Sequence, residues 1–213
     1  MRFRTFINFP VVFSAMTGDY NRKDRFYELA KAEGYRSRAA YKLKELNQRF
    51  KFLAHGAHVL DLGSWPGGWT QVAAQAVGER GLVVSIDLVP LEPLPQENVR
   101  LIAGDARDES SLNAIRSYAP NVSVIISDMS PKLTGIKVAD QMGTVACAEL
   151  AVWVAQQVLK PGGTLVMKVF KGNETDQFHR ANRTLFEKLN RIELESTRKT
   201  SNEFYLVGQG FKG

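Results

Sequence analysis

The sequence predicts an α/β fold with a mostly parallel sheet and helices on both faces. Three observations lead to this class. Short runs rich in Val, Ile and Leu alternate with longer helical segments along the chain. The runs are mostly apolar and do not alternate strictly with polar residues, as in strands that are buried on both faces. The 213 residues suit one domain with a sizeable core and are few for two domains.

The predicted elements follow one another in a regular order. Strands are expected at His58–Leu62, Leu82–Ile86, Val99–Ala103, Val122–Ser127, Thr164–Val169, Arg191–Leu194 and Phe204–Val207. Helices are expected at Trp69–Val77, Ser110–Tyr118, Asp140–Leu159 and Thr175–Leu189. The breakers Pro161, Gly162 and Gly163 separate the third helix from the next strand. The last two strands have no helix between them, so the final strand should run antiparallel, at the sheet edge or inserted beside its neighbours.

The N-terminus and the cysteine content bear on location. Two arginines precede an apolar stretch at the start of the chain, which faintly resembles a targeting segment, but Asn8 and Pro10 interrupt it. We expect residues 1–20 to form a poorly ordered extension before a single domain at residues 21–213. The one cysteine, Cys147, allows no internal disulfide, and no apolar run is long enough to span a bilayer. The sequence therefore favours a cytoplasmic protein.

Basic residues are concentrated before the first predicted strand. The chain carries a net charge of +6 and has a pI of about 9.5. Residues 22–51 contain Arg22, Lys23, Arg25, Lys31, Arg36, Arg38, Lys42, Lys44, Arg49 and Lys51, with Tyr27, Tyr35 and Tyr41 interleaved. Clustered positive charge with aromatic side chains suits RNA, and we expect Arg36 and Arg38 to contact it. The alternative is a solvated helix face.

The stretch DLGSWPGGWT, residues 61–70, predicts a small-ligand site. It leads from a strand through a glycine turn into a helix. Each of the first four predicted strands has an aspartate at or just beyond its end, and these are Asp61, Asp87, Asp105 and Asp128. Because the carboxyl ends of parallel strands share one edge, we expect these acids to line one site. Each of them alone could also be a helix cap or a turn residue.

Two cofactors are candidates for an acid-lined nucleotide site. An NAD site requires G-x-G-x-x-G after the first strand, and this chain has G-x-x-x-G-G instead. Asp87 suits a ribose diol and Asp105 suits an adenine amino group, but a phosphate cradle is missing. S-adenosylmethionine has a ribose, an adenine and a positive sulfonium but no pyrophosphate. The acids therefore favour S-adenosylmethionine.

Lys168 is the first candidate for chemistry. It lies in an otherwise apolar predicted strand, where burial of a charge is costly unless the group has a partner or a task. Burial favours the neutral amine, which could act as a base, and Asp128 at the end of the preceding strand can reach it. Lys42 lies at the rim of a helical apolar stripe made of Ala39, Leu43, Leu46 and Phe50. The alternative for Lys168 is an edge-strand lysine that reaches solvent.

Several motifs together resemble one family. D-L-G-x-x-P-G-G-W, I-D-L, G-D-x-R-D and S-D-M-x-P closely resemble the FtsJ-like family of RNA 2′-O-methyltransferases, over about Asp24 to Val207. The resemblance implies a Rossmann-like methyltransferase fold with a seven-stranded, mostly parallel sheet and a basic N-terminal helical lead. The family often has alanine where this chain has Ser64 or Trp65. The residues implied to contact S-adenosylmethionine are Gly67, Trp69, Asp87, Asp105 and Asp128.

The resemblance also selects catalytic residues. The family carries a Lys-Asp-Lys-Glu tetrad, which matches Lys42, Asp128, Lys168 and Glu203. Glu203 by itself would be a solvent-facing strand residue, and the resemblance alone selects it. The implied reaction is in-line transfer of a methyl group to a ribose 2′-hydroxyl. In it, Lys168 helps to deprotonate or orient the hydroxyl and Asp128 holds Lys168.

The implied substrate is a uridine in large-subunit ribosomal RNA. The tRNA anticodon loop is the alternative, because KDRFYELAKAEGYRSRAAYKL also resembles tRNA-directed members of the family. A non-catalytic RNA-binding protein of ribosome assembly is a third interpretation, which the complete tetrad disfavours. His55, His58 and His179 are too scattered to predict a metal site, and no membrane partner is expected.

Overall fold

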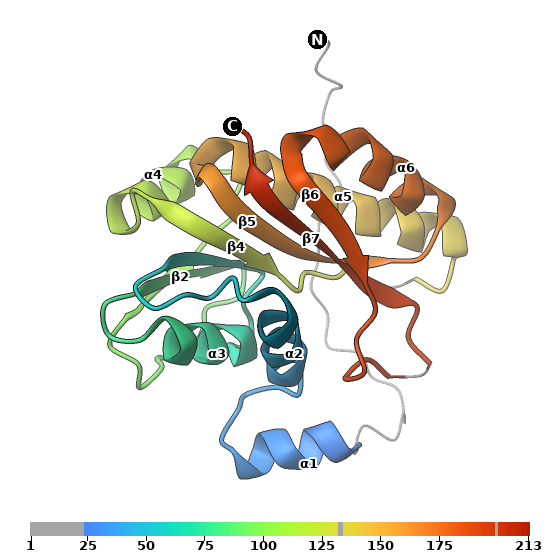
Figure 1. The fold of residues 1–213 in the computed structure, drawn as a ribbon. Helices are drawn as coiled ribbons and strands as arrows, with labels where there is room; N and C mark the ends of the chain where they lie inside the picture. The colour runs from blue at the N-terminus through green and yellow to red at the C-terminus, as the bar shows by residue number, and fades with distance from the viewer. Residues whose placement is uncertain (1–23, 132–133, 199) are drawn as a thin grey trace.

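A computed structural model describes residues 24–131, 134–198 and 200–213 of the chain (Figure 1). These residues form one seven-stranded sheet with the order β3-β2-β1-β4-β5-β7-β6. The strands are β1 (His58–Leu62), β2 (Leu82–Asp87), β3 (Val99–Ala103), β4 (Val122–Ser127), β5 (Leu159–Phe170), β6 (Phe186–Ile192) and β7 (Glu203–Phe211). Strands β1 to β5 are parallel, and β7 runs antiparallel to both β5 and β6. The predicted fold class, with its mostly parallel sheet, is confirmed.

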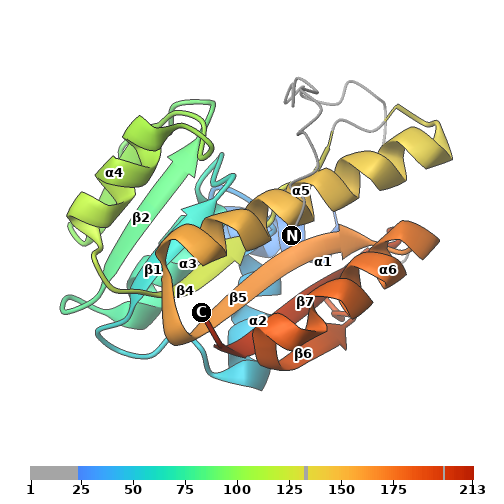
Figure 2. The ribbon, with the colours of Figure 1, turned by 90° about the horizontal axis from the view of Figure 1, so that it is seen from above.

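Helices cover both faces of the sheet. They are α1 (Arg25–Ala32), α2 (Ala40–Phe50), α3 (Gly68–Val77), α4 (Glu109–Tyr118), α5 (Lys137–Val158) and α6 (Asn173–Asn182). Figure 1 shows α4, α5 and α6 on one face and α2 and α3 on the other, with α1 beyond α2. From above, α5 runs along β4 and β5 (Figure 2). Within the described ranges no helix is long and apolar enough to cross a membrane. The extension expected at residues 1–20 lies outside those ranges.

The sheet divides the hydrophobic core into two layers. Leu60 and Val84 belong to the layer that α4, α5 and α6 cover. Val59 and Val83, one residue before each of them, belong to the layer under α2 and α3. Successive residues of a strand point to opposite faces of the sheet, so both faces of these strands are buried. This double burial explains why these runs of the sequence are nearly all apolar.

The region after α6 differs from the sequence-based prediction. The helix predicted at Thr175–Leu189 is wrong beyond Asn182, where α6 ends, and the strand predicted at Arg191–Leu194 begins too late, because β6 starts at Phe186. Phe186 is buried, pairs with Phe211 of β7, and the two ring centroids lie 5.6 Å apart. This packing overrides the local helical pattern. It also places β7 between β5 and β6, the second of the two expected positions.

The basic segment before β1, described from residue 24 to residue 51 and called the basic lead, contains the two helices α1 and α2. Asp24 caps α1, because its carboxylate accepts a hydrogen bond from the amide of Tyr27 at 3.0 Å. Helix α2 buries Leu43 and Leu46 in the layer that it shares with α3, as the apolar stripe predicts. Lys42 lies beside this stripe and is 8% exposed. Helix α2 therefore places a lysine inside the protein.

Candidate active site

The carboxyl ends of the parallel strands and the start of β7 meet at one edge of the sheet. Asp87 ends β2, while Asp105 and Asp128 closely follow β3 and β4. Because β7 is antiparallel to β5, its first residue, Glu203, pairs with Phe170 at the end of β5. Acids from different elements therefore lie at the edge where α/β proteins bind their ligands.

Asp128 and Lys168 form the centre of the site. The Nζ of Lys168 donates to the main-chain oxygen of Asp128 at 2.6 Å and lies 3.3 Å from the carboxylate oxygen Oδ1. The hydroxyl of Tyr205 donates to the same Oδ1 at 2.7 Å. Lys168 and Tyr205 are direct partners in the pairing of β5 with β7. Two adjacent strands thus hold both donors against one carboxylate.

A second ion pair joins Lys42 of α2 to Glu203 of β7. Each of these residues is 8% exposed, so the pair is largely shielded from water. The hydroxyl of Thr197 donates to Oε1 of Glu203 at 3.1 Å. The Nζ of Lys42 lies 6.0 Å from the ring centroid of Tyr205, whose hydroxyl binds Asp128. The fold therefore brings the four predicted catalytic residues together, with Tyr205 connecting the two pairs.

Burial and neighbouring charges together shift two pKa values of the site in opposite directions. Burial alone raises the pKa of Asp128, but the ammonium groups of Lys168 and Lys42 and the hydrogen bond from Tyr205 outweigh it, so the net shift is downward. Asp128 is therefore ionised at neutral pH. Burial also raises the pKa of Tyr205 well above 10.0, and the carboxylates of Asp128 and Glu203 add to this effect. Tyr205 is therefore a neutral hydrogen-bond donor.

The turn between β1 and α3 approaches the end of β4 closely. Gly63 has a φ of +69°, and a Cβ on it would lie 2.3 Å from Cγ of Met129. Gly67, the N-cap of α3, has a φ of 109°. Both positions favour glycine, which alone adopts this backbone region at little cost. The predicted cofactor turn thus lies against the residue that follows Asp128.

Asp87 and Asp105 have different surroundings. The two carboxylate oxygens of Asp87 accept hydrogen bonds from the amides of Trp65 and Val89, each at 2.9 Å. This fixes the carboxylate and leaves each oxygen a lone pair for a ligand hydroxyl. Asp105 is paired with Arg107, and hydrogen bonds from that guanidinium lower the pKa of Asp105. Part of the acceptor capacity of Asp105 is therefore already used.

Trp69 lies in the core. Its indole nitrogen donates to the main-chain oxygen of Ala39 at 2.7 Å, and its ring stacks on Tyr205 with centroids 5.8 Å apart. The residue is 3% exposed. The side chain therefore supports Tyr205 and the segment before α2. The main chain of Trp69, in the first turn of α3, is the part that can face a ligand at this edge.

Asp61, the acid of the first strand, is turned into the protein. It is 1% exposed and accepts a hydrogen bond from the hydroxyl of Thr70 at 2.7 Å. Burial raises the pKa of Asp61 to about 7, and the negative charges of Asp128 and Asp87 contribute to the shift. Asp61 therefore anchors α3 to β1. Of the four acids that we expected to line one site, Asp61 is buried and bonded to α3 instead.

Sequence reasoning missed Tyr205 and Thr197. The signal for Tyr205 was its place two residues after Glu203, because alternate residues of a strand share a face. Thr197 had no sequence signal, since it lies in a loop whose path depends on contacts with α2. In the part of the chain that the structure describes, no group of three or more His, Cys, Asp or Glu is placed to hold a metal ion.

Arg36 and Arg38, expected to contact RNA, are bound to protein groups. Arg38 pairs with Asp24 at 3.1 Å and donates to the main-chain oxygen of Ser196 at 2.7 Å. Arg36 donates to three main-chain oxygens in loops on either side of Asp87, those of Pro66, Glu92 and Pro93. Both arginines therefore fasten the basic lead to loops of the candidate site. Their contact with RNA stays a prediction.

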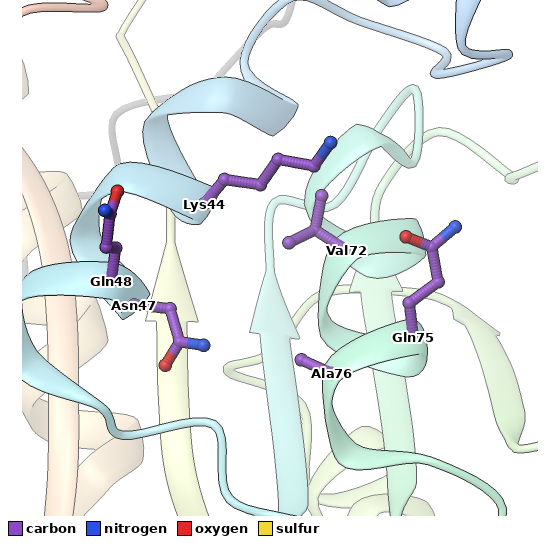
Figure 3. A pocket seen from close by; sticks show the side chains of 6 residues that line it. All are labelled: Lys44, Asn47, Gln48, Val72, Gln75 and Ala76. Atoms are coloured by element: carbon purple, nitrogen blue, oxygen red, sulfur yellow. The ribbon is translucent and has the colours of Figure 1, made fainter.

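A groove between α2 and α3 is lined by none of the residues of the Lys168–Asp128 and Lys42–Glu203 pairs. It has a volume of about 350 Å³ and is lined by Lys44, Asn47, Gln48, Val72, Gln75 and Ala76. Figure 3 shows Lys44 extending from α2 toward α3 beside Val72. The lining contains none of the predicted catalytic or cofactor-binding residues. The groove is open to solvent, so it offers little enclosure for a small ligand.

The whole site falls within one family match. A family model described as FtsJ-like methyltransferase matches residues 35–211, which include both ion pairs and the glycine turn. The chain belongs to the FtsJ-like methyltransferases. The predicted family and the predicted enzyme class, a methyltransferase, are confirmed. The family also agrees with S-adenosylmethionine as the predicted methyl donor.

Similar FtsJ-like proteins have ribosomal RNA in their names. A protein of Methanothermobacter thermautotrophicus named ribosomal RNA large subunit methyltransferase E is 44% identical over 193 residues, which are 90% of this chain and 92% of that protein. A protein of Stutzerimonas stutzeri with the same name is 41% identical over 197 residues, covering 92% and 95% of the two chains. The similarity extends over nearly the full length of these relatives.

Solved structures share the fold of this FtsJ-like chain. A Plasmodium falciparum protein assigned as a ribosomal RNA methyltransferase superposes with a TM-score of 0.75 at 27% identity, over 84% of this chain and all of that one. Aeropyrum pernix fibrillarin, solved with S-adenosylmethionine bound, gives a TM-score of 0.54 at 17% identity, over 79% and 75% of the two chains. The second likeness concerns the fold alone.

Proposed function

We propose that this chain transfers a methyl group from S-adenosylmethionine to the 2′-hydroxyl of a uridine ribose in large-subunit ribosomal RNA. The observation that carries the proposal is the pair of largely buried ion pairs, Lys168–Asp128 and Lys42–Glu203, at the ligand-binding edge of the sheet. Burying charged groups is costly unless they are paired and hydrogen-bonded. Here Tyr205 donates a hydrogen bond to Asp128 and Thr197 donates one to Glu203, so both carboxylates are held in place.

The residues at the glycine turn fit the proposed cofactor. When bound, S-adenosylmethionine supplies an electrophilic methyl group on a positively charged sulfur. Asp87, fixed by two amides, has free lone pairs for a ribose diol. Gly67 and the main chain of Trp69 lie at the start of α3, and Asp105 is the candidate for the adenine amino group. The ionised Asp128 favours a nearby positive charge.

The two ion pairs are placed to orient the ribose 2′-hydroxyl and to assist the loss of its proton. Lys168 binds Asp128 through two contacts, which fix the position of its Nζ beside the sheet edge. We assign Lys168 the task of orienting the ribose hydroxyl as an ammonium, or of accepting its proton as the neutral amine after releasing a proton to solvent, and Asp128 the task of holding Lys168. Lys42 and Glu203 position this pair through Tyr205. The charges are close enough that their titrations belong to the group and not to single residues.

Ribosomal RNA is the acceptor that the comparisons favour. The two relatives described above carry large-subunit ribosomal RNA in their names, and each covers nine-tenths or more of this chain. The net charge of +6 suits a polyanionic substrate. We place the reaction in the cytoplasm, on large-subunit RNA free or within the ribosomal subunit.

The substrate class is tested by comparing the methylation rates of different RNAs. Purified protein with labelled S-adenosylmethionine would be offered large-subunit ribosomal RNA, assembled large subunits and total tRNA in separate reactions. We expect label in a ribosomal fraction at a rate well above that in tRNA. Label confined to tRNA would overturn the ribosomal assignment and favour the anticodon-loop alternative. Absence of label in every RNA would overturn the proposed activity.

A further inference from the structure

Glu45 of α2 fastens the first part of the loop between β6 and β7, residues 193–198. Oε1 of Glu45 accepts a hydrogen bond from the amide of Glu195 at 3.0 Å. Oε2 accepts from the amide of Ser196 at 3.0 Å and from its hydroxyl at 2.8 Å. Arg49, one turn further along α2, pairs with the same carboxylate. One side chain of α2 therefore fixes two consecutive residues of the loop.

The same part of the loop is also held by the segment before α2 and by burial of its own residues. Arg38, just before α2, donates to the main-chain oxygen of Ser196 at 2.7 Å. Leu194 and Ser196 are 6% and 2% exposed, so both are buried under α2. The amide of Thr197 donates to the main-chain oxygen of Leu194 and closes a turn. The position of Thr197 is thus set by contacts made at its neighbours.

Thr197 connects this fastening to the candidate catalytic group. Its hydroxyl donates to Oε1 of Glu203 at 3.1 Å, and the same oxygen pairs with Lys42. Helix α2 therefore supplies Lys42 and, through Glu45, also fixes the hydroxyl that orients the partner of Lys42. A hydrogen bond to a carboxylate constrains which lone pairs face the lysine.

We propose that Glu45 and Thr197 are positioning residues for the Lys42–Glu203 pair in methyl transfer. The inference rests on the proposed function, because it assigns the two residues to that reaction. Glu45 acts at a distance through the loop, and Thr197 acts through Glu203. The amides of Ser196 and Glu195 support the charged form of Glu45: burial raises its pKa, but these hydrogen bonds outweigh it and the net shift is downward.

Two substitutions of Thr197 separate positioning from packing. Thr197→Val keeps the shape and removes the hydroxyl, while Thr197→Ser keeps the hydroxyl. We expect Thr197→Val to lower kcat roughly tenfold, with the KM for S-adenosylmethionine and the Tm nearly unchanged, and Thr197→Ser to restore most of kcat. Glu45→Gln should lower kcat similarly, whereas Glu109→Gln, an exposed carboxylate on α4, should not.

A double-mutant cycle tests whether Thr197 acts through Glu203. In single-turnover assays, Thr197→Val should have little further effect when Glu203→Gln is already present. Equal losses in the two backgrounds, or full kcat in Thr197→Val, would overturn the proposal. A readout independent of catalysis is the NMR resonance of the Glu203 carboxyl carbon, which should move in Thr197→Val and in Glu45→Gln. If the wild type methylates no RNA, the proposed function fails, and an unmoved resonance would separately refute the positioning contacts.

Discussion

The Nζ of Lys168 lies 3.3 Å from Oδ1 of Asp128 and is hydrogen-bonded at 2.6 Å to the main-chain oxygen of the same residue. This double contact places one amine at a fixed point beside the sheet edge. Lys168→Ala is therefore expected to lower the rate of methyl transfer by roughly 10²-fold or more. The partner of Lys168 is Asp128 and not a residue of the glycine turn. Binding of S-adenosylmethionine, measured by calorimetry, should therefore be nearly unchanged.

A neighbouring lysine gives the matched control for Lys168. Lys171 is also near the end of β5, but its side chain is 42% exposed and pairs with Glu193. Lys171→Ala should retain most of the activity. Substantial turnover by folded Lys168→Ala protein would contradict the role assigned to that amine.

Tyr205→Phe removes the hydroxyl and keeps the ring, so it tests the effect of the hydroxyl alone. The ring would still stack on Trp69, but Asp128 would lose a donor that helps to lower its pKa. We expect kcat to fall roughly tenfold. The free energy of unfolding should also fall at pH 7, because a carboxyl with a lowered pKa stabilises the fold above its unfolded pKa, near 3.8. This stability difference should narrow as the pH drops below that value, which urea unfolding at several pH values can measure.

Asp61→Asn should change how stability depends on pH. The pKa of Asp61 rises from 3.8 to about 7 in the folded protein, so the folded state keeps a proton that the unfolded state releases. Stability of the wild type is therefore lost as the pH rises from about 4 to about 7, by at most about 1.4 kcal/mol per pH unit. Asparagine does not titrate and can still accept from Thr70. The variant should gain stability relative to the wild type across this range, and a constant difference would contradict the shift.

Arg36→Ala tests whether this arginine acts on the protein or on RNA. Its hydrogen bonds join the lead to the loops beside Asp87. We expect a loss of stability of about 1–2 kcal/mol and weaker binding of S-adenosylmethionine, measured by thermal unfolding and calorimetry. The exposed Lys31 provides the comparison, since Lys31→Ala should leave both quantities unchanged. A reduced salt dependence of RNA binding with unchanged stability would instead support direct RNA contact by Arg36.

The centre of the sheet could be predicted from the sequence because its strands are buried on both faces. β1 and β4 begin and end where the apolar runs do, and the edge strand β3 also has the predicted bounds although none of its residues is buried. β5 begins earlier than predicted, since Leu159 pairs with Val122 before the register shifts across the breakers. The segment from Phe186 resisted prediction for another reason. Its strand state depends on pairing with β7, which comes later in the sequence and is invisible to local patterns.

The candidate site was predictable only in part. Lys168 and the acids at the strand ends stand out locally, because charge interrupts apolar sequence there. Glu203 does not, since its importance comes from the antiparallel insertion of β7 that brings it to Lys42. The protein contacts of Arg36 and Arg38 were hidden as well. A cluster of basic residues looks the same in a sequence whether its members bind RNA or main-chain oxygens.

The chemical identity of the methylated product tests the central claim most directly. The wild type and Lys168→Ala would be incubated with large-subunit ribosomal RNA and labelled S-adenosylmethionine, and the RNA digested to nucleosides for mass spectrometry. We predict that the wild type places the label on ribose, as 2′-O-methyluridine, and that Lys168→Ala gives little or none. Label on a base, or equal labelling by both proteins, would contradict the account.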